Sequence, residues 1–197
     1  MKIKTIDEAN EFLRKIPGIS KKQADKITSF ILNQPKDFTD ELTQKLNNIH
    51  TEISFCSKCN FIKEHNKCLN CDDVFKTKNL MIVESSTSLN KIDEMGVFLG
   101  YYFVLPYLMS AKKTNSAVDY NYPQLLSFIN QHEFEEVIIV LSPTLEGELT
   151  TNHLITLLEA QKLNVSRAAI GLPLGSNIEY LDSFTIKQAI NNRKSKE

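Results

Sequence analysis

The stretch Val137-Ile138-Ile139-Val140-Leu141-Ser142-Pro143-Thr144-Leu145-Glu146-Gly147-Glu148 decides the fold of this chain. Its first five residues form a continuous run rich in β-branched side chains, which is typical of a strand buried on both faces of a parallel sheet. An acidic turn follows directly, and we expect a helix over residues 148–160. A buried strand that passes through a turn into a helix favours a parallel α/β sheet.

The same alternation of strand and helix extends over residues 79–171. Residues 80–83 form a second short run of buried-strand type, and residues 101–105 and 165–170 are weaker strand candidates. Helices are expected near residues 89–95 and 122–131. The expected fold class is mixed α/β, with four parts: a helical region at 1–54, a small four-cysteine finger at 55–78, an α/β domain at 79–171 and a C-terminal segment at 172–197.

The first 55 residues predict three helices. Thr5 with Glu8, and Ser20 with Gln23, have the spacing of a capping box, in which the two side chains satisfy free N–H groups of the first turn. The first helix must end near Pro17-Gly18, and acids crowd the start of the third from Asp37. The apolar positions expected to face inward are Ala9, Phe12, Leu13, Ile16, Ala24, Ile27, Ile31, Leu32, Leu42, Leu46, Ile49 and Ile53.

All four cysteines of the chain lie in two Cys-x-x-Cys pairs separated by eight residues: Cys56, Cys59, Cys68 and Cys71. Each pair can turn both sulfurs toward one point, and two pairs complete a tetrahedral thiolate cage for Zn²⁺. The alternatives without a metal are two disulfides or four small buried hydrophobic residues. An iron–sulfur cluster is a further alternative, but the cysteines lack the clustered spacing usual for it. His65 lies between the pairs as a competing ligand or as a solvated loop residue. A closed four-cysteine site leaves no position for substrate, so the metal is expected to be structural.

Composition and charge are those of a cytosolic globular protein. The apolar stretch over residues 101–109 is about half of the roughly 20 residues that a membrane-spanning helix needs. The N-terminus lacks a signal-peptide core, and a reducing compartment favours metal over disulfides. The net charge of −1 is uneven: residues 1–78 hold 14 Lys and Arg against 11 Asp and Glu. This surplus supports only a weakly basic N-terminal face.

The segment from Ile16 to Ala24 resembles the helix-hairpin-helix motif of DNA-binding proteins. A tight turn at Gly18 would leave backbone N–H groups at the start of the next helix pointing at a phosphate, and Lys21, Lys22 and Lys26 would add positive charge beside them. Such contacts hold the DNA backbone without reading its bases. The motif's second glycine is Ser20 here. The bland alternative is an ordinary turn between helices with solvated lysines.

Acidic residues follow two of the expected strands. Glu84 ends the strand at residues 80–83, and Glu146 and Glu148 lie in the turn after residues 137–141, an arrangement that resembles the Toprim domain of topoisomerases, primases and some nucleases. Catalytic Toprim domains carry two Mg²⁺-binding aspartates where Ser142 and Thr144 stand here. A two-metal phosphoryl-transfer site is therefore not expected. The three glutamates are assigned to partner binding or weak metal binding, against the alternative that Glu146 and Glu148 only stabilise a helix N-terminus.

Taken in order, these motifs resemble the bacterial recombination mediator family RecR over nearly the whole chain. The phrases from Pro143 to Thr150 and from Gly171 to Gly175, the latter followed by Glu179-Tyr180, are the most specific. The resemblance implies a DNA-binding, non-enzymatic protein of recombinational DNA repair that forms a dimer or a ring-like tetramer. It also implies that the protein acts with RecO, and with RecF where present, to load RecA on single-stranded or gapped DNA. The chain departs from the family at Ser20 and over residues 106–113, where Pro106 and Tyr107 replace glycines.

Two other functions are carried as alternatives. One is a Mg²⁺-dependent Toprim nuclease or topoisomerase-like enzyme that uses the surviving glutamates. The other is a zinc-ribbon scaffold that binds only proteins. Metal-dependent cleavage would support the first of these, and a lack of DNA affinity even beside the partner protein would support the second.

Overall fold

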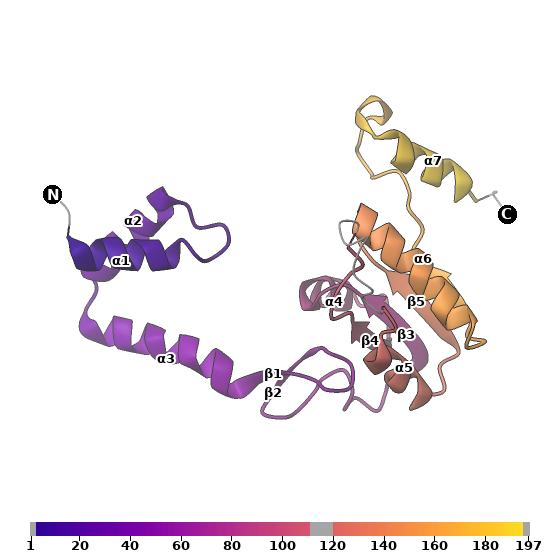
Figure 1. Ribbon diagram of the computed structural model, residues 1–197, viewed down its shortest axis with the longest axis horizontal. Coiled ribbons are helices and arrows are strands. Elements are labelled where there is room, and N and C mark those ends of the chain that lie inside the picture. Colours follow the sequence, from indigo (N-terminus) through magenta and orange to yellow (C-terminus); the bar gives the residue numbers. More distant parts are fainter. Residues whose placement is uncertain (1–2, 111–119, 195–197) are drawn as a thin grey trace. The chain divides into compact units, whose positions relative to one another are not determined.

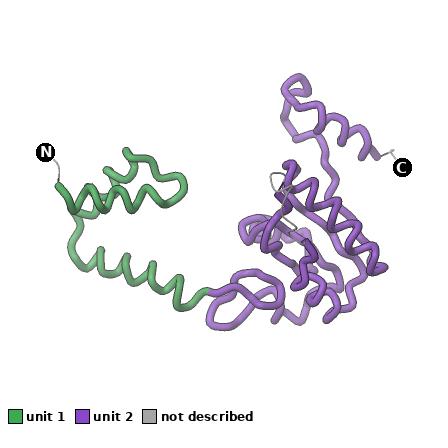
Figure 2. The backbone as a smooth tube through the Cα atoms, in the orientation of Figure 1, with its two compact units in different colours: residues 1–53 green, residues 54–197 purple. Residues whose placement is uncertain are grey.

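A computed structural model describes residues 3–110 and 120–194 of the chain. The chain divides into two compact units, residues 1–53 and residues 54–197 (Figure 2). Residues 111–113, the end of the segment where the family pattern is lost, lie outside the described residues. Among the described residues, no helix has the length and apolar character that crossing a membrane requires.

The larger unit is built on a four-stranded parallel sheet with the order β4-β3-β5-β6 (Figure 1). Met81 of the central strand β3 is paired with Tyr102 on one side and Ile138 on the other. The strands of this sheet are β3 (Thr77–Val83), β4 (Gly100–Val104), β5 (Glu136–Val140) and β6 (Val165–Arg167). The expected mixed α/β fold class is confirmed, although the last strand ends three residues earlier than the sequence predicts.

The sheet core follows from the apolar runs. Leu80, Ile82 and Val83 of β3 have no exposed surface, as expected of a strand with neighbours on both sides and helices over its faces. The helices of this domain are α4 (Ser86–Asp93), α5 (Pro123–Asn130) and α6 (Leu145–Glu159). Each follows a strand, as the sequence predicts. Helix α6 begins three residues earlier than expected, because Thr144 caps it by accepting a hydrogen bond from the Gly147 N–H group.

The smaller unit contains α1 (Lys4–Leu13), α2 (Lys21–Leu32) and α3 (Lys36–Glu52). The capping box at Ser20 and Gln23 is confirmed. The one expected at Thr5 is wrong, because α1 begins at Lys4 with Ile3 as its N-cap and without a side-chain cap hydrogen bond.

The inward stripe expected for these helices is also largely wrong for the chain as described. Only Ala24 is buried in α2, and no residue is buried in α1 or α3. Three short helices enclose too little volume to cover their own apolar faces. The residues of the expected stripe that remain exposed include Phe12, Ile16, Leu32, Leu42, Leu46 and Ile49.

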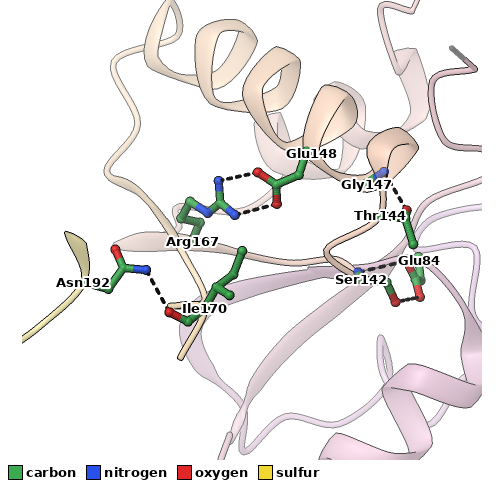
Figure 3. Close-up of polar contacts among 8 residues, drawn as sticks. All are labelled: Glu84, Ser142, Thr144, Gly147, Glu148, Arg167, Ile170 and Asn192. Carbon is green, nitrogen blue, oxygen red and sulfur yellow. Dashed lines mark hydrogen bonds and ion pairs between the residues drawn. The ribbon is translucent and has the colours of Figure 1, made fainter. Parts of the chain in front are cut away.

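The C-terminal segment leaves the sheet after β6 and ends in structure that the sequence did not predict. A short 3-10 helix η1 (Ile178–Tyr180) precedes helix α7 (Ser183–Asn191), which Asp182 caps. The Asn192 side chain donates a hydrogen bond of 3.1 Å to the Ile170 carbonyl oxygen and so ties the end of α7 to the chain just beyond β6 (Figure 3). Exposed apolar side chains, including Leu174 and Tyr180, mark this segment.

Candidate zinc site, phosphate-binding turn and acidic strand ends

The four cysteine sulfurs converge on one point of the finger. They lie within 4.8 Å of one another, and the Cys56–Cys71 and Cys59–Cys68 sulfurs are 3.9 and 3.6 Å apart. A tetrahedral zinc site with Zn–S bonds of about 2.3 Å has sulfur–sulfur edges of about 3.8 Å. All four cysteines are free thiols, so their number, spacing and chemistry fit Zn²⁺ and do not form the alternative disulfides.

The electrostatics of the cluster also suit a cation. A hydrogen bond from the Cys71 thiol lowers the pKa of Cys59 to about 5 although burial opposes this, and the same hydrogen bond raises the pKa of Cys71. Burial raises the pKa of Cys68 to about 11. One thiolate is therefore stabilised by its neighbours, and a metal ion would be needed to hold four. His65 is not part of the ligand cluster; it is an exposed turn residue with a positive φ of 47°.

The finger is fixed to the edge strand of the sheet. It contains a small two-stranded sheet, β1 (Ile53–Phe55) and β2 (Ile62–Glu64). The Asn70 side chain forms two hydrogen bonds of 2.8 Å with the backbone of Tyr102, donating to its carbonyl oxygen and accepting from its N–H group. The Val104 N–H group donates to the Cys59 carbonyl oxygen, and the Asn60 side chain donates to the Val104 carbonyl oxygen, both at 3.0 Å. Both cysteine pairs are thus joined to β4.

The turn between α1 and α2 leaves backbone donors exposed. Gly18 has a φ of +84°, which L side chains rarely adopt. Ser20 accepts a hydrogen bond from the Gln23 N–H group, and the Gln23 side chain accepts one from the Ser20 N–H group. The N–H groups of Gly18, Lys21 and Lys22 donate no hydrogen bond to any described residue. Serine at position 20 therefore preserves the helix start and leaves these donors available.

The lysines expected at this turn lie beside those donors. Lys21 and Lys22 begin α2, and Lys26 follows about one turn later on the same helix. All three are exposed, and none forms an ion pair within the described part of the chain. Free N–H groups at a helix N-terminus with nearby ammonium groups are suited to a phosphate.

Two of the three acidic residues at the strand ends, Glu84 and Glu148, are held by protein groups (Figure 3). Glu84 follows β3, and its carboxylate accepts hydrogen bonds from the Ser142 N–H group at 3.0 Å and from the Ser142 hydroxyl. Glu148 forms a two-pronged ion pair with Arg167 at the end of β6, with nitrogen–oxygen distances of 2.8 and 3.2 Å. Glu146 is half-buried, and no described residue forms a hydrogen bond with its carboxylate.

The three glutamates do not converge as metal ligands. Within the described ranges, the four cysteines are the single group of His, Cys, Asp and Glu side chains placed to share a metal ion. The Arg167 guanidinium supplies the positive charge beside Glu148. Arg167 could not be predicted from the sequence, because it lies 19 residues from Glu148, on another element, and no local pattern links the two.

Comparisons with known proteins agree on one family. A family model for the Toprim domain matches residues 78–169, and the model described as "RecR, C-terminal" matches residues 171–194. The chain is 34% identical to the recombination protein RecR of Mycoplasmopsis pulmonis over 194 residues, covering 98% of this chain and 100% of that protein. It is 31% identical to RecR of Tropheryma whipplei, with 98% of each chain covered, and 33% identical to RecR of Finegoldia magna, with 97% and 96% covered.

Proposed function

The chain belongs to the RecR family of recombination proteins, and on that premise we propose that it is a DNA-binding recombination mediator that catalyses no reaction of its own. The observation that carries the DNA-binding part is the turn at Gly18, where three backbone N–H groups have no acceptor among the described residues and Lys21, Lys22 and Lys26 are exposed. Binding through these groups is independent of base sequence and sensitive to salt.

A titration of DNA binding against salt tests this proposal. Affinity for single-stranded or gapped DNA should fall linearly on a log–log plot against salt, with each lost phosphate contact on single strands reducing the slope by about 0.7. Lys22→Glu should lower both affinity and slope. Lys45→Glu, the same charge change on an exposed lysine of α3, serves as the matched control. Equal behaviour of the two variants would contradict the assignment.

We propose that the metal is one structural zinc ion per chain, held by Cys56, Cys59, Cys68 and Cys71. The convergence of the four sulfurs, with distances near those of a tetrahedral zinc site, supports this assignment. Native mass spectrometry should find one zinc per chain and none after denaturation with a chelator. Retention of full fold by metal-free protein would argue against it.

The oligomer and its partners are further parts of the proposal. We assign residues 1–54 to DNA binding, 55–78 to the zinc finger, 79–171 to the Toprim domain and 172–197 to subunit contact. The exposed apolar side chains of the N-terminal helices and of the C-terminal segment support assembly into a dimer or ring-like tetramer.

RecO, and RecF where present, would be the protein partners in loading RecA. Repeated weak contacts around a ring add together, which compensates for a net charge of −1. Sedimentation analysis with and without RecO measures both associations.

The enzyme alternative has less support. Mg²⁺ prefers carboxylate and water oxygens, but Ser142 hydrogen-bonds Glu84 and Arg167 pairs with Glu148. DNA cleavage in Mg²⁺ or Mn²⁺ that disappears in Glu84→Gln would support the alternative, and absence of cleavage would support the mediator.

We place the protein in the cytoplasm, where four thiolates remain reduced for the metal.

A further inference from the structure

A cavity of about 450 Å³ lies between the finger and the sheet domain. The finger side of its lining includes Phe61, Leu69 and Asp73, and the sheet-domain side includes Asp93 of α4 and Tyr102 of β4. The volume falls within the range of sites that take a small molecule or a long side chain. These residues are separate from the phosphate-binding turn, the cysteine ligands and the acidic strand ends.

Tyr102 contributes a buried polar group to this cavity. Only 1% of the residue is exposed, and its hydroxyl forms no hydrogen bond of normal length and angle among the described residues, although the Asp93 side chain lies close enough to interact with it. The two hydrogen bonds with the Asn70 side chain hold the Tyr102 backbone in place, and the Lys76 ammonium lies 5.4 Å from the centroid of the Tyr102 ring. Burial, followed by the nearby Asp93 carboxylate, raises the pKa of Tyr102 to about 12, so the hydroxyl stays protonated at neutral pH. Buried hydroxyls normally form a well-aligned hydrogen bond, and the contact with Asp93 leaves this one only partly satisfied.

The charges of the cavity favour a cation. Asp72 and Asp73 each use one carboxylate oxygen to accept a backbone N–H group of the finger. Asp93 has no ion-pair partner in the described part of the chain. The lining also holds the ammonium groups of Lys67 and Lys76, the latter donating to the Gly100 carbonyl oxygen at 3.1 Å, so the three carboxylates leave a net charge of about −1.

The surroundings of the cavity favour a protein over a nucleic acid. Leu69 in the lining is 72% exposed, and Val74 and Phe75, which follow Asp73 in the chain, are 82% and 90% exposed. Exposed apolar side chains of this size are typical of protein-binding surfaces. Phosphates would meet the repulsion of the three carboxylates.

We propose that this cavity binds an arginine side chain of a partner protein, with apolar neighbours of that arginine packing on Leu69, Val74 and Phe75. The planar guanidinium can donate to the Asp93 carboxylate and to the Tyr102 oxygen at once, which a single ammonium does less well. Phe61 and Leu89 supply apolar wall for the arginine stem.

The test uses the full zinc-loaded chain and two short peptides, acetyl-Leu-Arg-Leu-amide and the same peptide with neutral citrulline in place of arginine. Titration followed by NMR should shift the side-chain amide signals of Asn70 and Asn90, with the arginine peptide binding at least about tenfold more tightly because it makes a charge-assisted contact. Asp93→Asn should abolish this preference. Tyr102→Phe should reduce affinity several-fold without loss of fold, since the hydroxyl forms no hydrogen bond of normal geometry in the free protein. Glu159→Gln, an exposed acid at the end of α6, is the control and should bind both peptides as the parent does.

Three results would overturn the proposal. Equal affinity for the two peptides, or no binding of either, would show that the cavity does not recognise the positive charge of arginine. Displacement of the arginine peptide from the same signals by a dT oligonucleotide would make the cavity a nucleic-acid site. A lower assembly mass for Asp93→Asn would place a second copy of this chain in the cavity, whereas the proposal requires an unchanged mass. None of these results depends on whether Lys22 contacts DNA.

Discussion

The ion pair between Arg167 and Glu148 provides the most quantitative prediction. It links β6 to the first turn of α6, and its side chains are only 32% and 20% exposed. Replacing Arg167 with glutamine removes the charge and leaves the half-buried Glu148 carboxylate without its cation. Two charges about 4 Å apart at an effective dielectric constant of 20 attract each other by roughly 4 kcal/mol. Solvent screening of the exposed portion reduces this to about 2 kcal/mol.

Thermal unfolding of the zinc-loaded protein measures this loss. For a chain of this size, about 2 kcal/mol corresponds to a decrease in Tm of roughly 4–8 °C. A double-mutant cycle with Glu148→Gln isolates the pair, because the doubly substituted protein no longer contains an unpaired carboxylate. We expect a coupling free energy of about 1–2 kcal/mol.

The exposed pair of Lys78 and Glu133 is the matched control. Its side chains are 61% and 93% exposed at a distance of 3.4 Å, so the same cycle should give less than about 0.5 kcal/mol. If the two cycles gave equal coupling, partial burial would not strengthen the Arg167 pair. Arg167 would then not be what holds the Glu148 carboxylate in place.

Three further predictions concern other parts of the larger unit. Gly147→Ala should destabilise the protein by about 3 kcal/mol in denaturant unfolding, because the added Cβ would lie 1.9 Å from the Ser142 carbonyl oxygen; an unchanged midpoint would contradict this contact. Cys59→Ser should abolish zinc retention and increase amide exchange throughout the finger, whereas Ser57→Ala should change neither. Hydrogen bonds from the Thr185 hydroxyl and N–H groups lower the pKa of Asp182, so helix α7 should be fully capped above the ordinary aspartate pKa and fray as pH falls through the lowered one. The NMR chemical shift of the Thr185 amide should follow this pH transition in the parent protein and should show no such transition in Asp182→Asn.

Local patterns in the sequence were sufficient for the sheet and the finger. The apolar runs predicted β3 and β5 because strands covered on both faces need no polar alternation, and the spacing of the cysteines predicted their convergence. The Asp182 cap before α7 was also visible as an Asp three residues ahead of Thr185, and was missed. The partners of Glu84 and Glu148 come from residues 58 and 19 positions away, so only the folded sheet reveals that Ser142 and Arg167 occupy their carboxylates.

The N-terminal helices show the opposite case. Their apolar periodicity predicts a stripe that faces inward, but most of that stripe is exposed in the structure. Phe12 and Leu32 are 68% and 74% exposed, because periodicity identifies an apolar face without identifying what covers that face.

The hydrogen bonds from the finger to β4 have a consequence for solubility. Strand β4 is the edge of the sheet, and the backbone groups of Tyr102 and Val104 bonded by Asn70, Cys59 and Asn60 are those that an incoming strand would otherwise use. The four-cysteine finger therefore covers the edge of the sheet at which another strand could pair. Oxidation of the cysteines or loss of a bound metal that loosened the finger would expose the β4 edge to strands of other molecules. The damaged protein would then aggregate before it unfolded globally.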